Sequence, residues 1–430
     1  MSVLNACVLT IGDELLNGDV VNTNSLWLGQ RLRSAGLTCT SMITVSDRKS
    51  EILRVLRFLW DDHDLIVLTG GLGPTHDDVT KSALLEFFDD KPKRNEKVLK
   101  HVLAYFKRKG RDATDVNRQQ ADVPSKARIL FNELGTAPGI LMEQMGKILV
   151  ALPGVPYEMR YITEKRLIPE IEKRWHESER RIQQHYFRTT GIGESELSDR
   201  IIKNQHHRIP KTVDIAFLPH PMGVDLRVTE VDGESGNGFN ELVGWIRKAA
   251  GEFIFSEKYK ETLACLIVTL LTKYQKTVSF AESCTGGFLS NAITDIPGSS
   301  NCFRGGIIAY DNRVKTEFTG VASGTIEQHG AVSAAVALEL AKKTGETMET
   351  DFAVSTTGVA GPGGGSEDKP VGTVWIGFWS RSGQHFACRY LFSSERLINK
   401  ERSCAAGLEI LRRQILNIKG LPNHPEVVRT

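Results

Sequence analysis

The residues best suited to chemistry follow short apolar runs that read as buried strands. The run TVSFA leads into ESCTGG at 282–287 and then into an amphipathic helix. Ser283 is therefore predicted on a strand-to-helix turn, with the backbone amides of Thr285, Gly286 and Gly287 at the helix N-terminus. Such amides can hold a phosphate or a developing oxyanion. The alternative is that Ser283 or Thr285 only caps the helix and the glycines only allow a tight turn.

A second run, GGIIAY, ends at Tyr310 and is followed by Lys315 in a helical pattern. A lysine in a desolvated cleft can lose its proton and deprotonate a serine, and a tyrosine can relay a proton. These residue types predict a Ser-Lys site made of Ser283, Lys315 and Tyr310. Two plainer interpretations stay open. Lys315 would be a solvated helix lysine, and Cys284, a rival nucleophile, would be a small buried hydrophobe.

A third run, FAVSTT, opens into the glycine-rich segment at 358–365. Glycines after a buried strand let the backbone approach a ligand closely, although a flexible loop would have the same composition. The segment is not a P-loop, because Asp368 precedes Lys369 where that motif needs glycine. The chain also lacks a G-x-S-x-G elbow, so a hydrolase of that type is not predicted.

The N-terminal part offers a second site after the runs ACVLTI and DLIVLT. The residues expected to bind phosphate there are Gly12, Gly70, Gly71, Gly73 and Thr75. Clustered carboxylates would repel a phosphate, so we expect a divalent cation (Mg²⁺, Mn²⁺ or Co²⁺) held by Asp13 and Asp78. Simple helix capping by Thr75 and Asp78 would explain part of the pattern, and His76 is a weaker candidate ligand.

The surrounding patterns predict an α/β protein with two α/β domains joined by a small α+β module. Strands alternate with helical patterns in the first and last parts, which is typical of parallel sheets covered by helices. The expected domains are 1–168, 169–255 and 256–418, followed by a loosely ordered tail at 419–430. The charged helix starting near 163 is expected at the beginning of the middle module.

Composition and charge exclude several classes of protein. Lys plus Arg number 54 and Asp plus Glu number 52, so the net charge of +2 gives no general attraction to nucleic acid or membrane. The seven cysteines form no C-x-x-C pair and indicate reduced thiols in an intracellular protein. No apolar run approaches the ~18 residues of a membrane span. We therefore expect a cytoplasmic protein.

The ordered motifs resemble those of the CinA (competence and damage inducible) family. The N-terminal motifs are IGDELLNGDVVNTNS, LTGGLGPTHDDVT, NRQQA, GTAPG and LPGVPYEM, and the C-terminal ones are AESCTGG, PGSS, GGIIAYDNRVK, HGAVS, TTGVAGPGGG and KPVGTVWI. The resemblance implies a molybdopterin-binding-like N-terminal domain with metal-dependent ADP-ribose pyrophosphatase activity. It also implies a KH-like middle module and a C-terminal domain that deamidates nicotinamide mononucleotide without a cofactor. Homodimers are implied as well.

Carried over residue by residue, the resemblance makes Ser283 the catalytic serine, with Tyr310 and Lys315 as its partners. The residues implied to line the nucleotide site are Thr285, Gly286, Gly287, Asn312, Thr357, Gly358, Gly361 and Arg396. This chain departs from the family at Lys400, where many relatives have an arginine, so a planar fork becomes a point charge.

Two classes of function remain open. One is a pyridine-nucleotide enzyme with either or both activities, and the other is a non-catalytic pterin- or nucleotide-binding regulatory protein. For the enzyme, attack by Ser283 to form an acyl-enzyme and attack by an activated water are both open. The GIGE segment at 191–194 lacks the second glycine of a G-x-x-G loop, so nucleic-acid binding is not expected.

Overall fold

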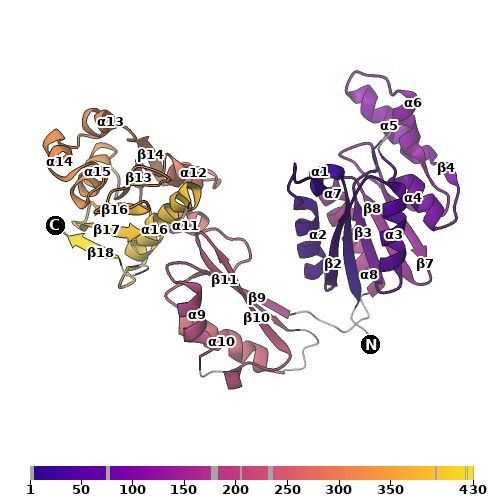
Figure 1. Ribbon diagram of the computed structural model, residues 1–430, viewed down its shortest axis with the longest axis horizontal. Coiled ribbons are helices and arrows are strands. Elements are labelled where there is room, and N and C mark those ends of the chain that lie inside the picture. Colours follow the sequence, from indigo (N-terminus) through magenta and orange to yellow (C-terminus); the bar gives the residue numbers. More distant parts are fainter. Residues whose placement is uncertain are drawn as a thin grey trace. The chain divides into compact units, whose positions relative to one another are not determined.

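The computed structural model describes residues 4–73, 78–175, 183–203, 206–230, 236–392, 395–421, 423 and 425–429. The chain divides into two compact units, Met1–Arg181 and Ile182–Thr430 (Figure 1). No helix within the described ranges has the length and apolar character needed to cross a bilayer.

The first unit is built on one mixed sheet with the strand order β2-β1-β3-β8-β7-β6. Its strands are β1 (Asn5–Ile11), β2 (Thr38–Val45), β3 (Leu65–Thr69), β6 (Arg128–Leu130), β7 (Gly139–Gln144) and β8 (Lys147–Leu152), and β4 (Pro92–Arg94) pairs separately with β5 (Asp122–Pro124). Its helices are α1 (Asp13–Leu16), α2 (Thr23–Ser34), α3 (Lys49–Trp60), α4 (Thr80–Phe87), α5 (Glu96–Arg108), α6 (Asp115–Arg118), η1 (Gln119–Ala121), α7 (Pro156–Ile162), the π-helical η2 (Thr163–Leu167) and α8 (Ile168–Trp175). One apolar core lies on each face of this sheet, with α3 and α4 on one side and α2 and α7 on the other.

The central strand β1 fixes where a ligand can bind in this unit. It pairs in parallel with β2 on one side and β3 on the other. The chain passes from β1 to β2 on one side, and α3 then carries it across to β3 on the other side of β1. Such a reversal of strand order opens a crevice at the carboxyl ends of the strands. The segments after β1, β2 and β3 consequently meet at one edge of the sheet.

The charged helix near 163 belongs to the first unit rather than to the middle module. Ile168 and Ile171 of α8 are buried in the core that also contains Leu28 and Leu32 of α2. These apolar residues recur on one face of an otherwise charged helix, and their burial holds it on the N-terminal sheet. The first unit thus continues beyond residue 168, where the sequence pattern placed its end.

The second unit begins with the small α+β module. Its sheet has the order β10-β11-β9-β12, formed by β9 (Gln183–Thr189), β10 (Val213–His220), β11 (Gly223–Glu230) and β12 (Ile254–Ser256). Helices α9 (Glu194–Ile201) and α10 (Gly238–Ala250) cover one face, with a short η3 (His206–Arg208) between. Every second residue of β11 is buried, as expected for a sheet with a single covered face.

The C-terminal domain contains a second mixed sheet with the order β14-β13-β15-β16-β17-β18. The strands are β13 (Val278–Glu282), β14 (Phe303–Ile308), β15 (Phe352–Gly358), β16 (Thr373–Ser380), β17 (His385–Leu391) and β18 (Glu426–Arg429). The helices are α11 (Leu263–Lys273), α12 (Phe288–Thr294), η4 (Ser299–Asn301), α13 (Asn312–Glu317), α14 (Ser323–His329), α15 (Ala334–Thr347) and α16 (Arg396–Leu416). β13 lies between β14 and β15 and is parallel to both, so its carboxyl end is again a reversal point of the strand order.

The tail after Lys419 contains ordered structure, contrary to the expectation from its composition. β18 pairs antiparallel with β17, from Phe386 opposite Arg429 to Arg389 opposite Glu426. Prolines and a glycine precede this strand, so its short Val-Val core does not stand out as a strand in the sequence. The segment is ordered because it pairs with β17, which is distant in the sequence.

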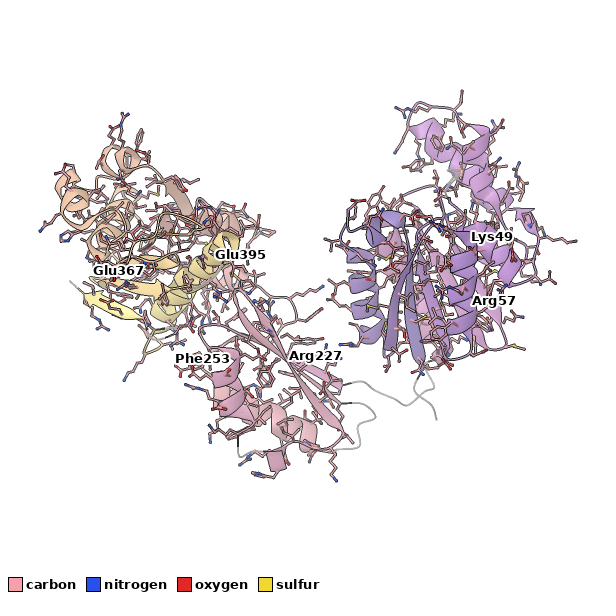
Figure 2. The ribbon with its side chains drawn as sticks, viewed as in Figure 1. Lys49, Arg57, Arg227, Phe253, Glu367 and Glu395 are labelled. Atoms are coloured by element: carbon pink, nitrogen blue, oxygen red, sulfur yellow. The ribbon has the colours of Figure 1, made fainter. Side chains whose placement is uncertain are left out.

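The middle module and the C-terminal domain share a buried charge network. The carboxylate of Glu409 accepts hydrogen bonds from Arg412 Nε at 2.6 Å and from Arg413 Nε at 2.7 Å. Arg412 Nη2 also donates to the Glu252 carbonyl at 2.6 Å. The Arg413 guanidinium lies 5.3 Å from the ring centroid of Phe253, which Figure 2 labels. This network ties the end of α10 to α16.

Replacing Glu409 with alanine should destabilise the protein strongly. Two guanidinium groups would remain buried without their carboxylate, and breaking a buried ion pair in this way costs about 3–5 kcal/mol. Urea unfolding monitored by circular dichroism measures the loss. The control is Glu317→Ala, which breaks the exposed pair with Arg313 at 3.2 Å and should change the free energy of unfolding by less than about 0.5 kcal/mol. Equal effects of both substitutions would contradict the assignment.

Candidate functional site

Ser283 lies on the turn between β13 and α12, and a buried carboxylate organises that turn. Glu282 is 1% exposed. Its oxygens accept hydrogen bonds from the amides of Gly287, Leu289 and Ser290 at 2.8–3.0 Å. They also accept from the hydroxyls of Thr285 at 2.8 Å and Ser290 at 2.6 Å. The carboxylate therefore caps the first turn of α12 from inside the fold.

Fewer backbone amides are free at this turn than the sequence predicted. The Gly287 amide donates to Glu282, and the Gly286 amide donates to the Ser283 carbonyl at 3.1 Å. In the described part of the chain, the Thr285 amide alone of the three expected donors has no protein acceptor. The Thr285 hydroxyl points inward, where it bonds to Glu282 and Thr356. An anion at this turn can thus use one amide, not three.

Lys315 is the most unusual charged side chain of the C-terminal domain. It lies on α13 and is 1% exposed, and its Nζ donates to the Tyr310 carbonyl at 3.0 Å. No carboxylate oxygen of the described residues is within ion-pair distance of it. Burial lowers the pKa of Lys315 from its ordinary value, and the nearby charge of Asp311 opposes that shift only partly. The sequence-based prediction of a desolvated lysine at this strand end agrees with its burial.

The structure does not join Ser283 and Lys315 directly. Within the described ranges, no hydrogen bond connects Ser283 Oγ to Lys315 Nζ. Ser283 is buried, and its amide donates to the Thr356 carbonyl at 2.9 Å. Besides Asp311, the titratable neighbour that affects the pKa of Lys315 is Cys284. Burial raises the pKa of the Cys284 thiol to about 12, so this cysteine stays protonated, as a buried hydrophobe would.

Arg396 connects two other predicted site residues, Tyr310 and Gly361. It begins α16, directly after Glu395, which Figure 2 labels. Its guanidinium donates to the Tyr310 hydroxyl at 2.9 Å and to the Gly361 carbonyl at 2.7 Å. Lys400 lies one turn further along α16, and a Cβ on Gly286 would be 3.7 Å from its Nζ. Arg396 and Lys400 therefore both face the loops around Ser283.

The remaining predicted residues of this site divide into exposed and internal ones. Asn312 is exposed at the start of α13. The Thr357 hydroxyl donates to the Ala331 carbonyl at 2.7 Å and is 1% exposed, so it is not directed at a ligand. Gly358 has a structural reason to be glycine, because a Cβ there would lie 2.6 Å from the Thr373 carbonyl oxygen.

The N-terminal site surrounds a small pocket at the carboxyl ends of β1 and β3. The pocket has a volume of 140 Å³ and is lined by Glu14, Asn22, Asn24 and Gly70, among others. Three of the predicted glycine amides are already bonded. The Gly12 amide donates to Val45, the Gly70 amide to Leu152 and the Gly73 amide to the Asp78 carboxylate. Within the described residues, the amide of Gly71 is the one left without an acceptor, and Thr75 and His76 lie outside the described residues.

Gly70 and Gly71 are required by close contacts inside the loop. Both have positive φ, and a Cβ on Gly70 would lie 2.3 Å from the Ile11 carbonyl oxygen. A Cβ on Gly71 would lie 2.5 Å from the Thr80 hydroxyl. The expectation that these glycines mainly expose amides to phosphate is therefore corrected, because their main role is to let the loop pack on β1.

The charges of Asp13 and Asp78 both act on the pKa of a third carboxylate, Asp47, which the sequence reasoning missed. The Asp13 amide donates to Asp47 Oδ2 at 2.8 Å. The pKa of Asp47 is raised, first by partial burial and then by the charges of Asp13, Glu14 and Asp78. Such mutually repelling oxygen donors suit a hard cation. No three of the metal-binding side chains in the described ranges are close enough together to form a ready-made metal site.

Glu282 and Asp47 were both missed for identifiable reasons. Glu282 is the last residue of β13 and lies three residues before Thr285, a spacing that indicates capping. Asp47 follows β2, whose sequence TCTSMITV is half polar and does not have the pattern of a buried strand. An acidic residue at or just after the end of a parallel strand is the sequence signal that both share.

Comparison with known proteins gives the family. Three family models match the chain in order: a probable molybdopterin binding domain at 7–173, a damage-inducible protein CinA KH domain at 184–256 and a CinA C-terminal domain at 260–415. A CinA-like protein of Flavobacterium psychrophilum is 37% identical over 96% of this chain and 99% of its own length. The chain belongs to the CinA family.

A second curated relative corresponds over nearly the full length, and a solved CinA structure corresponds to part of this chain. A putative competence-damage inducible protein of Caldicellulosiruptor saccharolyticus is 37% identical over 95% of this chain and 99% of its own. The solved structure titled as the protein CinA with unknown function from Thermoplasma acidophilum is 34% identical, covers 39% of this chain and 98% of its own, and has a TM-score of 0.37. The three-domain organisation expected from the sequence is thus that of a CinA protein.

Substituting Glu282 with glutamine should destabilise the turn that carries Ser283. An amide cannot accept all five hydrogen bonds, and each buried donor left unsatisfied costs about 1–3 kcal/mol. The melting temperature of the variant, measured by calorimetry, should fall by several degrees, while that of the control Glu327→Gln, an exposed carboxylate on α14, should not change. An unchanged melting temperature for Glu282→Gln would show that this cap contributes nothing.

Proposed function

We propose that the C-terminal domain hydrolyses the carboxamide of nicotinamide mononucleotide to the nicotinate form and ammonia. The observation that carries the proposal is Lys315, a buried lysine with a lowered pKa that contacts no carboxylate among the described residues and lies near the Ser283 turn. A lysine whose pKa is lowered in this way can act as a general base. The choice of substrate follows the family resemblance.

The chain's own residues supply the parts of an amide hydrolysis. Lys315 takes a proton from the Ser283 hydroxyl or from a water, and the resulting oxygen nucleophile attacks the carboxamide carbon. The Thr285 amide is positioned to donate to the oxyanion. The carbon–nitrogen bond breaks, the departing nitrogen takes a proton, and ammonia leaves. In the Ser283 route a water then hydrolyses the acyl-enzyme. Because no hydrogen bond joins Ser283 and Lys315 within the described residues, attack by an activated water is proposed on the same footing as attack by Ser283.

Arg396 and Lys400 are the proposed partners of the substrate phosphate. Both are on the first two turns of α16 and face the loops around Ser283 and Gly361. Two of the guanidinium donors of Arg396 are already used in hydrogen bonds to Tyr310 and Gly361. Lys400 therefore supplies the positive charge that is more available to a ligand. Lys400 would bind phosphate as a point charge rather than bidentately.

Ser283→Ala and Lys315→Met should each lower ammonia release from nicotinamide mononucleotide by about 10²–10⁴-fold, the usual contribution of an acid–base group. Release is measured with purified full-length protein. The controls are Ser300→Ala and Lys343→Met, which change exposed residues of the same domain and should keep full activity. An acyl adduct on Ser283 detected by mass spectrometry would select the serine route. Full activity in Lys315→Met would refute the role of the lysine.

The pH profile provides an independent check on Lys315. The base must be neutral, so kcat/KM should rise about tenfold per pH unit below the lowered pKa of Lys315 and level off above it. Between that pKa and the ordinary lysine value of 10.5, the unfolded state binds more protons than the folded state. Stability should therefore increase with pH in the same window. Lys315→Met should remove this stability trend.

For the N-terminal domain we propose hydrolysis of the pyrophosphate of ADP-ribose, supported by the coupled carboxylates around Asp47. Asp13, Asp47 and Asp78 would hold a divalent cation, which when bound polarises the pyrophosphate. The competing proposal is a binding site for a pterin or nucleotide without catalysis, which the pocket beside Gly70 and Asn24 would also suit.

Asp47→Asn and Asp78→Asn should reduce Mg²⁺-dependent hydrolysis of ADP-ribose by at least about tenfold, because each removes a charged oxygen donor. AMP formation is measured by chromatography with Mg²⁺, Mn²⁺ or Co²⁺ and with chelator. Asp112→Asn, an exposed carboxylate of the same unit, is the matched control. Tight binding of ADP-ribose by the wild type without any product, whatever the cation, would favour the non-catalytic class.

A further inference from the structure

Lys81 is a partly buried lysine, and nothing in the chemistry described so far uses it. It is the second residue of α4, immediately after the glycine-rich loop. Its Nζ donates to the carbonyls of Gln119 at 3.3 Å and Gln120 at 3.2 Å, and to Gln120 Oε1 at 3.2 Å. The lysine thus reaches from α4 to η1, which lies in the NRQQA segment.

All three acceptors around Lys81 are neutral. No carboxylate oxygen of the described residues is within ion-pair distance of its Nζ. Burial lowers the pKa of Lys81 to about 8, although the charges of Asp122 and Asp78 oppose the shift. Even partial burial of an ammonium without a counter-ion has a desolvation cost. An anion bound next to Lys81 would remove that cost.

Gln120 provides a second, independent observation at the same place. Its side chain is 1% exposed, and its Nε2 has no hydrogen-bond partner in the structure, although its Oε1 is bonded to Lys81. A buried N–H donor without an acceptor is destabilising and calls for an explanation. Within the described residues, a partly buried ammonium and a buried amide group, joined by a hydrogen bond, both lack an anionic partner.

The loop geometry places these donors beside the N-terminal site. Thr80, the residue before Lys81, donates through its hydroxyl to the Gly70 carbonyl at 2.9 Å and through its amide to the Gly71 carbonyl at 3.2 Å. Asp78, coupled to Asp47, also influences Lys81. The start of α4 is therefore fixed against the loop that borders the carboxylate group.

We propose that Lys81 and Gln120 bind a phosphate oxygen of a nucleoside diphosphate, as the cationic side of the N-terminal site. This assignment rests on the proposed function of that domain and deepens it by naming the residues that would hold the diphosphate. Lys81 and Gln120 neutralise and orient one phosphate, while the carboxylates around Asp47 form the opposite, cation-holding side. The division explains how an acidic cluster and a dianionic ligand share one site.

The alternative is that Lys81 only joins α4 to η1. A purely structural lysine would affect stability but not the affinity for phosphate, so the two roles give different results in a binding experiment.

The test is isothermal titration calorimetry of full-length protein with ADP-ribose and with inorganic pyrophosphate, in chelator so that metal-dependent turnover does not interfere. Lys81→Met should weaken both affinities at least about tenfold. Lys81→Arg should retain part of the binding, because the positive charge remains. Lys97→Met, an exposed lysine on α5, should bind as the wild type does. Gln120→Met should weaken binding less than Lys81→Met.

The outcomes separate this proposal from the hydrolase proposal. Wild-type binding that Lys81→Met loses, without any hydrolysis when Mg²⁺ is restored, would support the phosphate site and reject the hydrolase. Hydrolysis and binding that are unchanged in Lys81→Met would reject the phosphate site alone. Wild-type protein that binds neither probe would also overturn it.

A second measurement covers the case in which Lys81→Met does not fold. Acetic anhydride acetylates lysine amines, and peptide mass spectrometry reports the extent at Lys81 in the wild type. Pyrophosphate should protect Lys81 and leave Lys97 unprotected. Equal acetylation of Lys81 with and without pyrophosphate would overturn the proposal.

Discussion

The C-terminal site depends on one buried carboxylate. Glu282 collects five hydrogen bonds at the start of α12, so the path of the chain from β13 into the helix is fixed from within. Ser283 and the Thr285 amide take their positions from this arrangement. The same cap satisfies helix-terminal donors that would otherwise attract an anion, and this is consistent with the proposal that α16, rather than the turn, supplies the charges for a phosphate.

The two α/β domains share the same placement of loops and of a lysine at their candidate sites. Each places its loops at a reversal point of strand order, and each brings there a lysine that contacts no carboxylate among the described residues. Lys315 is fully buried, and Lys81 is partly buried. Lys315 bonds to the Tyr310 carbonyl, and Lys81 bonds to the carbonyls of Gln119 and Gln120. Backbone carbonyls orient an ammonium without neutralising it, so both lysines keep a charge or a lone pair available. The packing of each domain offsets the free energy of desolvating its lysine.

Sequence patterns predicted the strands that are apolar throughout, such as β1, β3, β8, β13 and β15, because a buried parallel strand is a continuous hydrophobic run. They missed β2 and β18, whose order comes from pairing partners distant in the sequence. For the sites, residue type and position after a strand were sufficient to choose Ser283 and Lys315, whereas Arg396 was chosen only through the family resemblance. The occupation of the glycine amides, and the convergence on Asp47, depend on three-dimensional contacts that spacing along the chain does not encode.

The short strand β18 has a consequence for the C-terminal sheet. It covers the outer side of β17, a strand in which Ala387 and Cys388 are fully buried. A chain shortened before Glu426 would leave a row of unpaired backbone groups beside apolar side chains, which is the kind of edge onto which another chain adds a strand. By pairing with β17, strand β18 protects this edge against aggregation. A fusion partner attached directly after β18 must leave that pairing intact.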